Sequence, residues 1–197
     1  HSKAWYELGW AYNYQTGSYK VTEASYEPYT RCIALDPKNA MAHNHLGWLL
    51  HDVRKDYDGA EKLYRKAIEL DPSDASAHNH LGRLIYDQKD YVKAEEMYRK
   101  AIELEPTCAH AHDNLGTLLN ARKDYDGAKQ HYRKAIELDP SGGAYHNNLA
   151  DLLMKGGDLG EAEKKIREAI KIDPQDAVYH STYGEILEAK SNIPGAI

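Results

Sequence analysis

The sequence predicts an all-α solenoid of stacked antiparallel helix pairs. The first observation is a regular series of prolines separated by 35, 34, 34 and 34 residues: Pro37, Pro72, Pro106, Pro140 and Pro174. The second is the similar run before the last four prolines, KAIELDP, KAIELEP, KAIELDP and EAIKIDP. A period in this range is typical of repeats that stack on one another rather than of a single globular core.

Length, composition and charge limit the possible functions. The 197 residues correspond to about six repeats of this length, and a chain that is 42% hydrophobic and 28% charged is expected to be folded and soluble. No apolar stretch approaches the roughly 20 residues that cross a bilayer. The net charge of -6, with no block of Lys or Arg, argues against binding to nucleic acid or to an anionic membrane surface.

The two cysteines indicate a reducing compartment. Cys32 and Cys108 lie two repeats apart, which is too far for the Cα separation of a disulfide. Both are therefore predicted to be free thiols, and we expect the chain to be cytoplasmic.

The repeats are expected over residues 2–39, 40–74, 75–108, 109–142, 143–176 and 177–197, in a single array. The first has about four extra residues, which predicts a loop over 17–24 and a short second helix beginning near Pro28. The second has one extra residue over 51–55, which predicts a longer turn. The sixth stops soon after Ala196 and lacks a polar cap, so we expect a fragment of a longer protein or an end that packs on another molecule.

The third repeat shows the pattern of one unit. Its first half has apolar or small residues at helical spacing from Ala77 to Ile85, and a polar turn follows over 87–90. A second apolar stripe runs from Tyr91 to Leu104 before Pro106 ends the helix. Neither helix can bury its stripe alone, so the helix pairs must stack.

The repeat closely resembles the tetratricopeptide repeat, whose pattern is W-x2-L-G-x2-Y followed by a small residue, an aromatic residue and Pro. Trp5, Leu8, Gly9 and Tyr12 carry the opening motif intact. Leu-Gly recurs in the second, third and fourth repeats, and a Tyr takes the aromatic place of the second helix, at Tyr64, Tyr98 and Tyr132. The resemblance covers the whole chain and implies a right-handed superhelix with a concave groove that binds proteins or peptides.

Five histidines share one repeat position: His43, His78, His112, His146 and His180. Zinc–nitrogen bonds are about 2.1 Å long, whereas equivalent residues of stacked repeats lie roughly 10 Å apart, so one ion cannot collect them. We expect half-buried imidazoles that bond neighbouring carbonyl groups, and no metal or other cofactor. Catalytic motifs such as G-x-S-x-G or a phosphate-binding glycine loop are absent from the sequence, so we expect no enzyme.

In tetratricopeptide repeats the groove is lined mainly by the first helix of each repeat. Carried onto this sequence, the resemblance implies a set of peptide-binding candidates: Tyr6, Trp10, Tyr14, Asn44, Trp48, Asn79, Arg83, Tyr86, Asp113, Asn114, Asn147, Asn148 and Asp151. Aromatic residues gather at the N-terminal end and acidic residues at the other. Trp10 and Trp48 are either interface anchors or covers for a neighbouring helix.

The asparagines also leave two alternatives open. Their amides can pair with the backbone of an extended peptide, or they can bridge adjacent helices. The hypothesis is a protein-interaction scaffold that binds a peptide or partner segment in the groove. The alternatives are self-association through the incomplete sixth repeat, and an accessory region of a larger enzyme.

Overall fold

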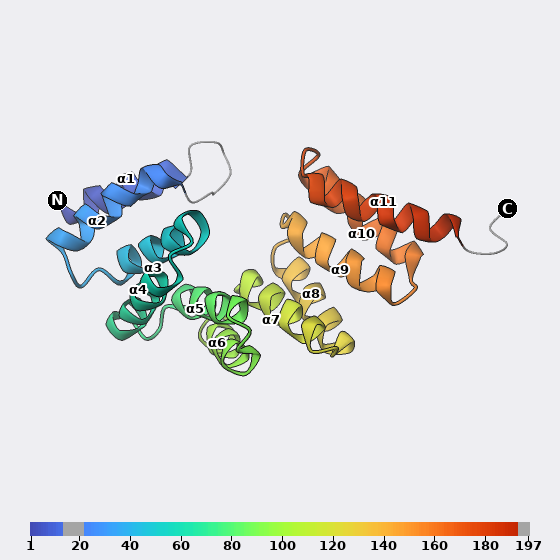
Figure 1. The fold of residues 1–197 in the computed structure, drawn as a ribbon, viewed down its shortest axis with the longest axis horizontal. Coiled ribbons are helices and arrows are strands. Elements are labelled where there is room, and N and C mark those ends of the chain that lie inside the picture. Colours follow the sequence, from blue (N-terminus) through green and yellow to red (C-terminus); the bar gives the residue numbers. More distant parts are fainter. Residues whose placement is uncertain (14–21, 193–197) are drawn as a thin grey trace. The chain divides into compact units, whose positions relative to one another are not determined.

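The computed structural model describes residues 1–13 and 22–192, in which helices follow one another along the chain (Figure 1). The helices are α1 (Ser2–Asn13), the 3-10 turn η1 (Glu23–Ser25), α2 (Tyr26–Leu35), α3 (Ala40–Leu49), the π-helical turn η2 (Leu50–Arg54), α4 (Tyr57–Leu70), α5 (Ala75–Asp87), α6 (Tyr91–Leu104), α7 (Ala109–Ala121), α8 (Tyr125–Leu138), α9 (Gly143–Lys155), α10 (Leu159–Ile172) and α11 (Ala177–Ser191). No strand occurs in these residues, so the predicted all-α solenoid class is confirmed.

Consecutive helices pack as pairs, α1 with α2 through α9 with α10, and α11 packs on α10. The chain divides into two compact units, the N-terminal unit His1–Pro106 and the C-terminal unit Thr107–Ile197. That all the repeats form one array stays a prediction.

In the second to fifth repeats, an aspartate caps the start of the second helix of the repeat. Asp56, Asp90, Asp124 and Asp158 each accept a hydrogen bond from the backbone N–H three residues later, at 3.0–3.2 Å. Such a cap satisfies one of the N–H groups that a helix start leaves without an intrahelical partner. The last turn of each of these helices ends before the Asp-Pro or Glu-Pro pair, where proline disfavours helix.

In the first four helix pairs, a glycine of the first helix faces a tyrosine of the second helix. A Cβ atom added at Gly47, Gly82 or Gly116 would lie 2.8–2.9 Å from the ring of Tyr64, Tyr98 or Tyr132. Only glycine allows this close approach, and the three rings are almost fully buried. In the fifth repeat, Ala150 of α9 takes the place of the glycine and Ile166 of α10 takes the place of the tyrosine. The larger residue on the first helix is thus accompanied by a smaller side chain on the second.

The irregular repeats differ from the others in defined places. Pro28 is the third residue of α2, in its first turn, as predicted. The predicted loop over 17–24 falls mostly outside the described residues. The extra residue of the second repeat does not lengthen the turn but enters the helix: Asp56 N–H bonds to Leu50 O, six residues back, where later repeats bond five residues back.

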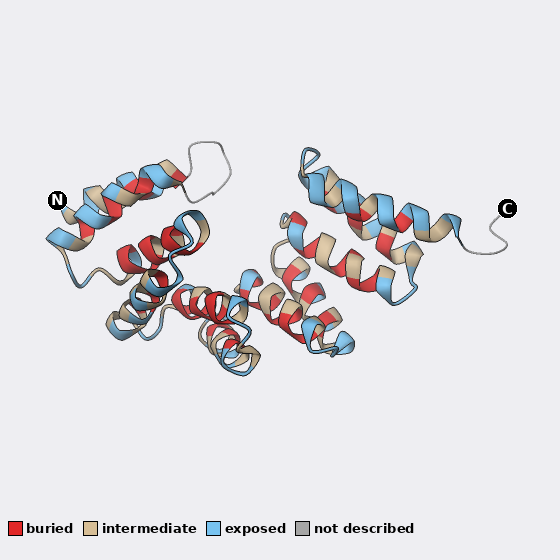
Figure 2. Cartoon of the chain, viewed as in Figure 1, coloured by how far each residue is buried: buried red, intermediate tan, exposed pale blue. Residues whose placement is uncertain are grey.

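Exposure varies along the chain (Figure 2). Helices α5, α7 and α9 are buried along most of the face that meets their partners. By contrast, Thr182 and Ile186 are the buried residues of α11.

Candidate binding face

In the N-terminal unit, we use the name anchor face for four residues on the first helices of two successive repeats, Tyr6 and Trp10 of α1 and Met41 and Trp48 of α3. The Tyr6 hydroxyl lies 3.6 Å from Met41 Sδ, which joins the two helices. Trp10 is 43% exposed and Met41 is 54% exposed. The anchor face therefore presents large apolar side chains to solvent from two successive repeats.

Trp48 is held in place by the next repeat. Its ring stacks on His80 of α5, with centroids 5.2 Å apart and an interplanar angle of 26°. Its indole N–H donates to Asp52. Trp48 is thus half-buried and covers part of α5, which was one of the two alternatives left by the sequence, and its remaining surface is what it contributes to the anchor face.

The π-helical turn of the second repeat supports a polar network next to Trp48. It brings the buried His51 ring to 2.9 Å from the carboxylate of Asp87 and 3.3 Å from the Arg83 guanidinium. Arg83 also pairs with Asp52. Burial, followed by the nearby Arg83 charge, lowers the pKa of His51. This network fixes Arg83, a predicted binding residue on α5, against the π-helical turn η2.

Two residues of the asparagine series, Asn44 and Asn148, link helices. Asn44 is buried on α3, donates to Asp74 at 3.2 Å and lies 2.8 Å from His80 Nδ1. In the C-terminal unit, Asn148 of α9 donates to both carboxylate oxygens of Asp113 on α7, at 3.0 and 3.2 Å. The bridging alternative therefore holds for Asn44 and Asn148.

Burial raises the pKa of Asp113 to about 6, against the lowering effect of the bond from Asn148. Asn79 is buried like Asn44, and Asn114 is half-buried. Asn147 is half-buried too, and its Oδ1 has no hydrogen-bond partner among the described residues.

Two further predicted binding residues, Tyr86 and Asp151, contact neighbouring residues of their own repeats. Tyr86 contacts Tyr91 across the turn of the third repeat, with ring centroids 5.3 Å apart. Asp151 pairs with Lys155 at 2.6 Å. Tyr14 lies outside the described residues. The structure thus links Asn44, Trp48 and Arg83 through His80 and Asp52. Tyr6 contacts Met41 of α3, and Asp113 and Asn148 belong to the other unit.

Four of the five histidines of the column bond a backbone carbonyl group as predicted, but the residues are buried rather than half-buried, except His180, which is exposed. His78, His146 and His180 each place Nε2 2.9–3.3 Å from the carbonyl oxygen of the proline six residues earlier. His43 bonds to Asn39 O through Nδ1 at 2.8 Å. His112 instead meets His131, with 3.0 Å between the two Nδ1 atoms. Across residues 1–13 and 22–192, no three His, Cys, Asp or Glu side chains gather as metal ligands would.

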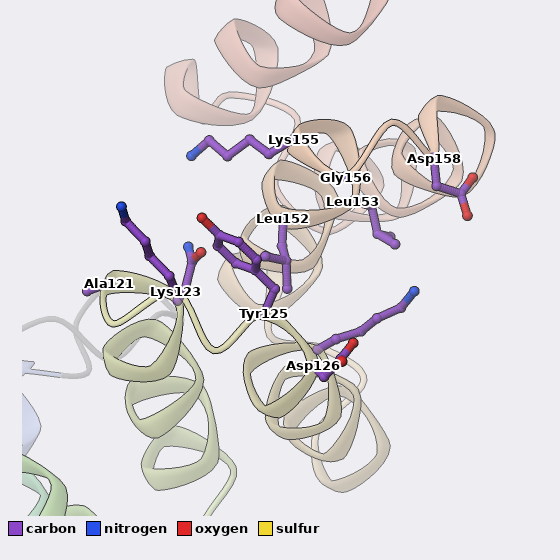
Figure 3. A pocket seen from close by; sticks show the side chains of 11 residues that line it. Ala121, Lys123, Tyr125, Asp126, Leu152, Leu153, Lys155, Gly156 and Asp158 are labelled. Carbon is purple, nitrogen blue, oxygen red and sulfur yellow. The ribbon is translucent and has the colours of Figure 1, made fainter.

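A pocket of about 620 Å³ lies in the C-terminal unit, between the α7–α8 turn and the α9–α10 turn (Figure 3). Leu152 and Leu153 supply apolar surface and Tyr125 supplies a ring. Three lysines line the pocket as well. This pocket was not predicted from the sequence. The signal that could have found it is Lys129, which stands where the second, third and fifth repeats have Glu.

Family models of the tetratricopeptide repeat match residues 29–62, 73–141 and 119–186, and a model described as TPR repeat matches 54–89. The chain belongs to the tetratricopeptide-repeat family. A Sel1 repeat model matches residues 2–27, where the first repeat departs from the regular length. No curated protein matches the chain.

Several solved structures resemble this tetratricopeptide-repeat chain. The PilF protein of Pseudomonas aeruginosa is 24% identical with a TM-score of 0.75, and the match covers 98% of this chain and 92% of that one. TTC0263, a thermophilic TPR protein of Thermus thermophilus, is 18% identical with a TM-score of 0.79, covering 95% and 100%. YrrB, described as a TPR protein with an unusual peptide-binding site, is 25% identical with a TM-score of 0.62, covering 86% and 87%.

The solved structures show the fold, and the family matches support a general role as a protein-interaction scaffold. Cys32 and Cys108 are both free thiols, as the sequence predicted. In the described part of the chain, no helix combines the length and the apolar character needed to cross a membrane.

Proposed function

We propose that this chain is a non-catalytic scaffold that binds an extended segment of a protein partner, with the anchor face as the main contact. The observation that carries the proposal is the exposure of Trp10 and Met41 on two successive first helices, together with the contact between Met41 and Tyr6. Trp and Tyr are common hot spots of protein interfaces. An apolar anchor of the partner would cover this surface and remove it from water.

The polar residues nearby would support such a contact. Asn44 holds α3 and α5 in register through Asp74 and His80, so its role is to position Trp48 rather than to contact the peptide. Arg83 and Tyr86 remain half-exposed on α5 and are candidates for direct contact. YrrB has the same fold and is described as having a peptide-binding site, which supports this type of ligand.

In the C-terminal unit, the candidates for peptide contact are Asp113, Asn114, Asn147, Asn148 and Asp151. All five are half-buried, so each retains some exposed surface. We include cytoplasmic location in the proposal because both cysteines are free thiols.

The test starts from peptides selected against the chain from a displayed library. All three tryptophans lie in the first 48 residues, so their fluorescence reports binding at the N-terminal unit. We expect Trp10→Ala and Trp48→Ala each to weaken binding about tenfold or more. Val92→Ala is the matched control, because Val92 is exposed on a second helix, α6. Equal affinities of all three variants would refute the anchor face.

A second candidate function is self-association through α11. In this helix Leu187 is 44% exposed, whereas its equivalent in the fifth repeat, Leu153, is 3% exposed beneath α10. Gly184 has no atom within 4 Å of an added Cβ, unlike Gly47, Gly82 and Gly116. Among the described residues, this face of α11 is thus open where other first helices are covered.

Light scattering over a wide concentration range tests this candidate. Self-association through α11 predicts a mass that grows with concentration and returns to the monomer value in Leu187→Glu. Val92→Glu introduces the same charge at an exposed site on α6 and should leave the association intact. A monomer mass at every concentration would exclude this function.

A further inference from the structure

The pocket of the C-terminal unit differs from the equivalent places in other repeats in ways that change its chemistry. In the third repeat, the ring of Tyr86 contacts the ring of Tyr91 across the helix turn. In the fourth repeat Asn120 takes the place of Tyr86, while Tyr125 repeats Tyr91. The shorter side chain leaves the Tyr125 ring half-exposed at the pocket of about 620 Å³, a volume within the range of ligand sites.

The charges at this pocket are also reversed. Lys129 stands where the other complete repeats have Glu61, Glu95 and Glu163, and those glutamates pair with an arginine one turn later on the same helix. In the fourth repeat that arginine is Arg133, which reaches Glu161 of α10 instead, at 3.1 Å.

Lys155 likewise occupies the position of Asp87 in the third repeat. Its ammonium pairs with Asp151 at 2.6 Å. A third lysine, Lys123, lines the same pocket. Among the described residues, neither Lys123 nor Lys129 has a carboxylate within ion-pair distance.

Two aspartates also line the pocket. Asp158 caps α10 by accepting from Glu161 N–H at 3.1 Å, and its carboxylate points away from Tyr125 in Figure 3. Asp126 lies in the first turn of α8. The lysines therefore outnumber the acids around an apolar floor of Leu152 and Leu153.

We propose that this pocket binds a short acidic segment of a partner protein, in which an apolar side chain is flanked by carboxylates. The apolar side chain would pack on Leu152, Leu153 and the Tyr125 ring. The carboxylates would meet the ammonium groups of Lys123 and Lys129, which attract opposite charge and favour it over neutral or basic segments. The Asn120 amide can donate to a peptide carbonyl or a carboxylate.

The probe is the blocked peptide acetyl-Glu-Leu-Glu-Leu-Glu-amide, titrated into the ¹⁵N-labelled full chain and followed by amide chemical shifts. We expect shifts concentrated at Lys123, Tyr125, Leu152 and Leu153, and weaker binding at higher salt. The matched peptide with Gln in place of Glu should bind about tenfold more weakly or not measurably.

Three variants locate the site. Lys129→Glu and Asn120→Tyr restore residues found in other repeats, so both should fold, and each should weaken probe binding about tenfold or more. Lys164→Glu makes the same change of net charge on an exposed part of α10 outside the pocket and should have little effect. Thermal unfolding of each variant confirms that the fold is retained.

The proposal is overturned if the lining amides do not shift, if the Gln peptide binds as well as the Glu peptide, or if Lys164→Glu weakens binding as much as Lys129→Glu. It is also overturned if inorganic phosphate displaces the probe with equal affinity, because the pocket would then be a site for small anions.

Discussion

Two adjacent positions of the first helices differ greatly in how much they vary from repeat to repeat. The small residue that faces the second helix is glycine in every repeat except the fifth, which has Ala150. The very next position varies along the chain between aromatic, basic, polar and acidic residues: Trp10, Trp48, Arg83, Thr117, Asp151 and Glu185. Packing against the second helix therefore restricts the first of these positions to a small residue, whereas the residue after it can differ from repeat to repeat.

The largest loss of stability is expected from a substitution that disturbs the packing of glycine against tyrosine. In Gly82→Ala the new Cβ would lie 2.8 Å from the Tyr98 ring, so overpacking should cost about 1–3 kcal/mol of unfolding free energy. Gly184→Ala is the matched control, because nothing lies within 4 Å of its Cβ. Alanine's better helix propensity should make it neutral or stabilising by up to about 1 kcal/mol. Urea unfolding measures both, and equal losses would contradict the packing account.

The buried carboxyl group of Asp113, on the first helix of the fourth repeat, should make the stability of the chain depend on pH. Its pKa is raised to about 6 by burial, so the folded state holds its proton more tightly than the unfolded chain, where Asp titrates near 4. Its contribution to stability is full below about pH 4 and is lost as the pH rises through about 6.

Asp113→Asn should therefore stabilise the chain by about 1–2 kcal/mol at pH 7.5 and flatten its pH dependence between 4 and 6. Urea unfolding at a series of pH values measures both effects. A variant that is no more stable than the parent at pH 7.5 would show that the buried carboxylate carries no such cost.

The turns between paired helices provide a third contrast. Lys55, Lys89 and Lys123 adopt the left-handed backbone region with φ of 57°, 68° and 66°, and the fifth repeat has Gly157 there with φ of 83°. Lys123→Gly should stabilise the chain by roughly 0.5–1 kcal/mol, because glycine has no Cβ to strain. Gly157→Ala should destabilise it by a similar amount. If urea unfolding shows both changes acting in the same direction, backbone strain does not control these turns.

The smallest effect concerns the pocket lysine. Lys129→Glu restores the pairing with Arg133 one turn later that the other repeats have, so it should add about 0.3–0.5 kcal/mol to stability. This gain, measured by thermal unfolding, should shrink in high salt. A loss of stability would show that Lys129 has a structural role in the folded chain.

The fold could be predicted from the sequence because the same pattern of two helices recurs in several repeats. The spacing of prolines and apolar residues placed the helix pairs, and Pro28 marked the first turn of α2. The π-helical turn was missed, since a single extra residue can enter either a loop or a helix, and the choice depends on packing around His51.

The candidate site was less predictable. The sequence placed Asn44 and Asn148 on the first helices but could not decide between a ligand and a neighbouring helix as their partner. That choice depends on whether Asp74 and Asp113 come within hydrogen-bond distance, which only the packed helices determine. The pocket was missed because its signal is a difference between repeats, Asn120 and Lys129, rather than a recurring motif.

The most direct test of the central claim is an amide chemical-shift map of the full chain with a peptide selected from a displayed library. The account predicts the largest changes at the outer positions of the first helices, around Trp10, Trp48 and Arg83. Changes confined to exposed residues of second helices, such as Val92 on α6, would contradict it.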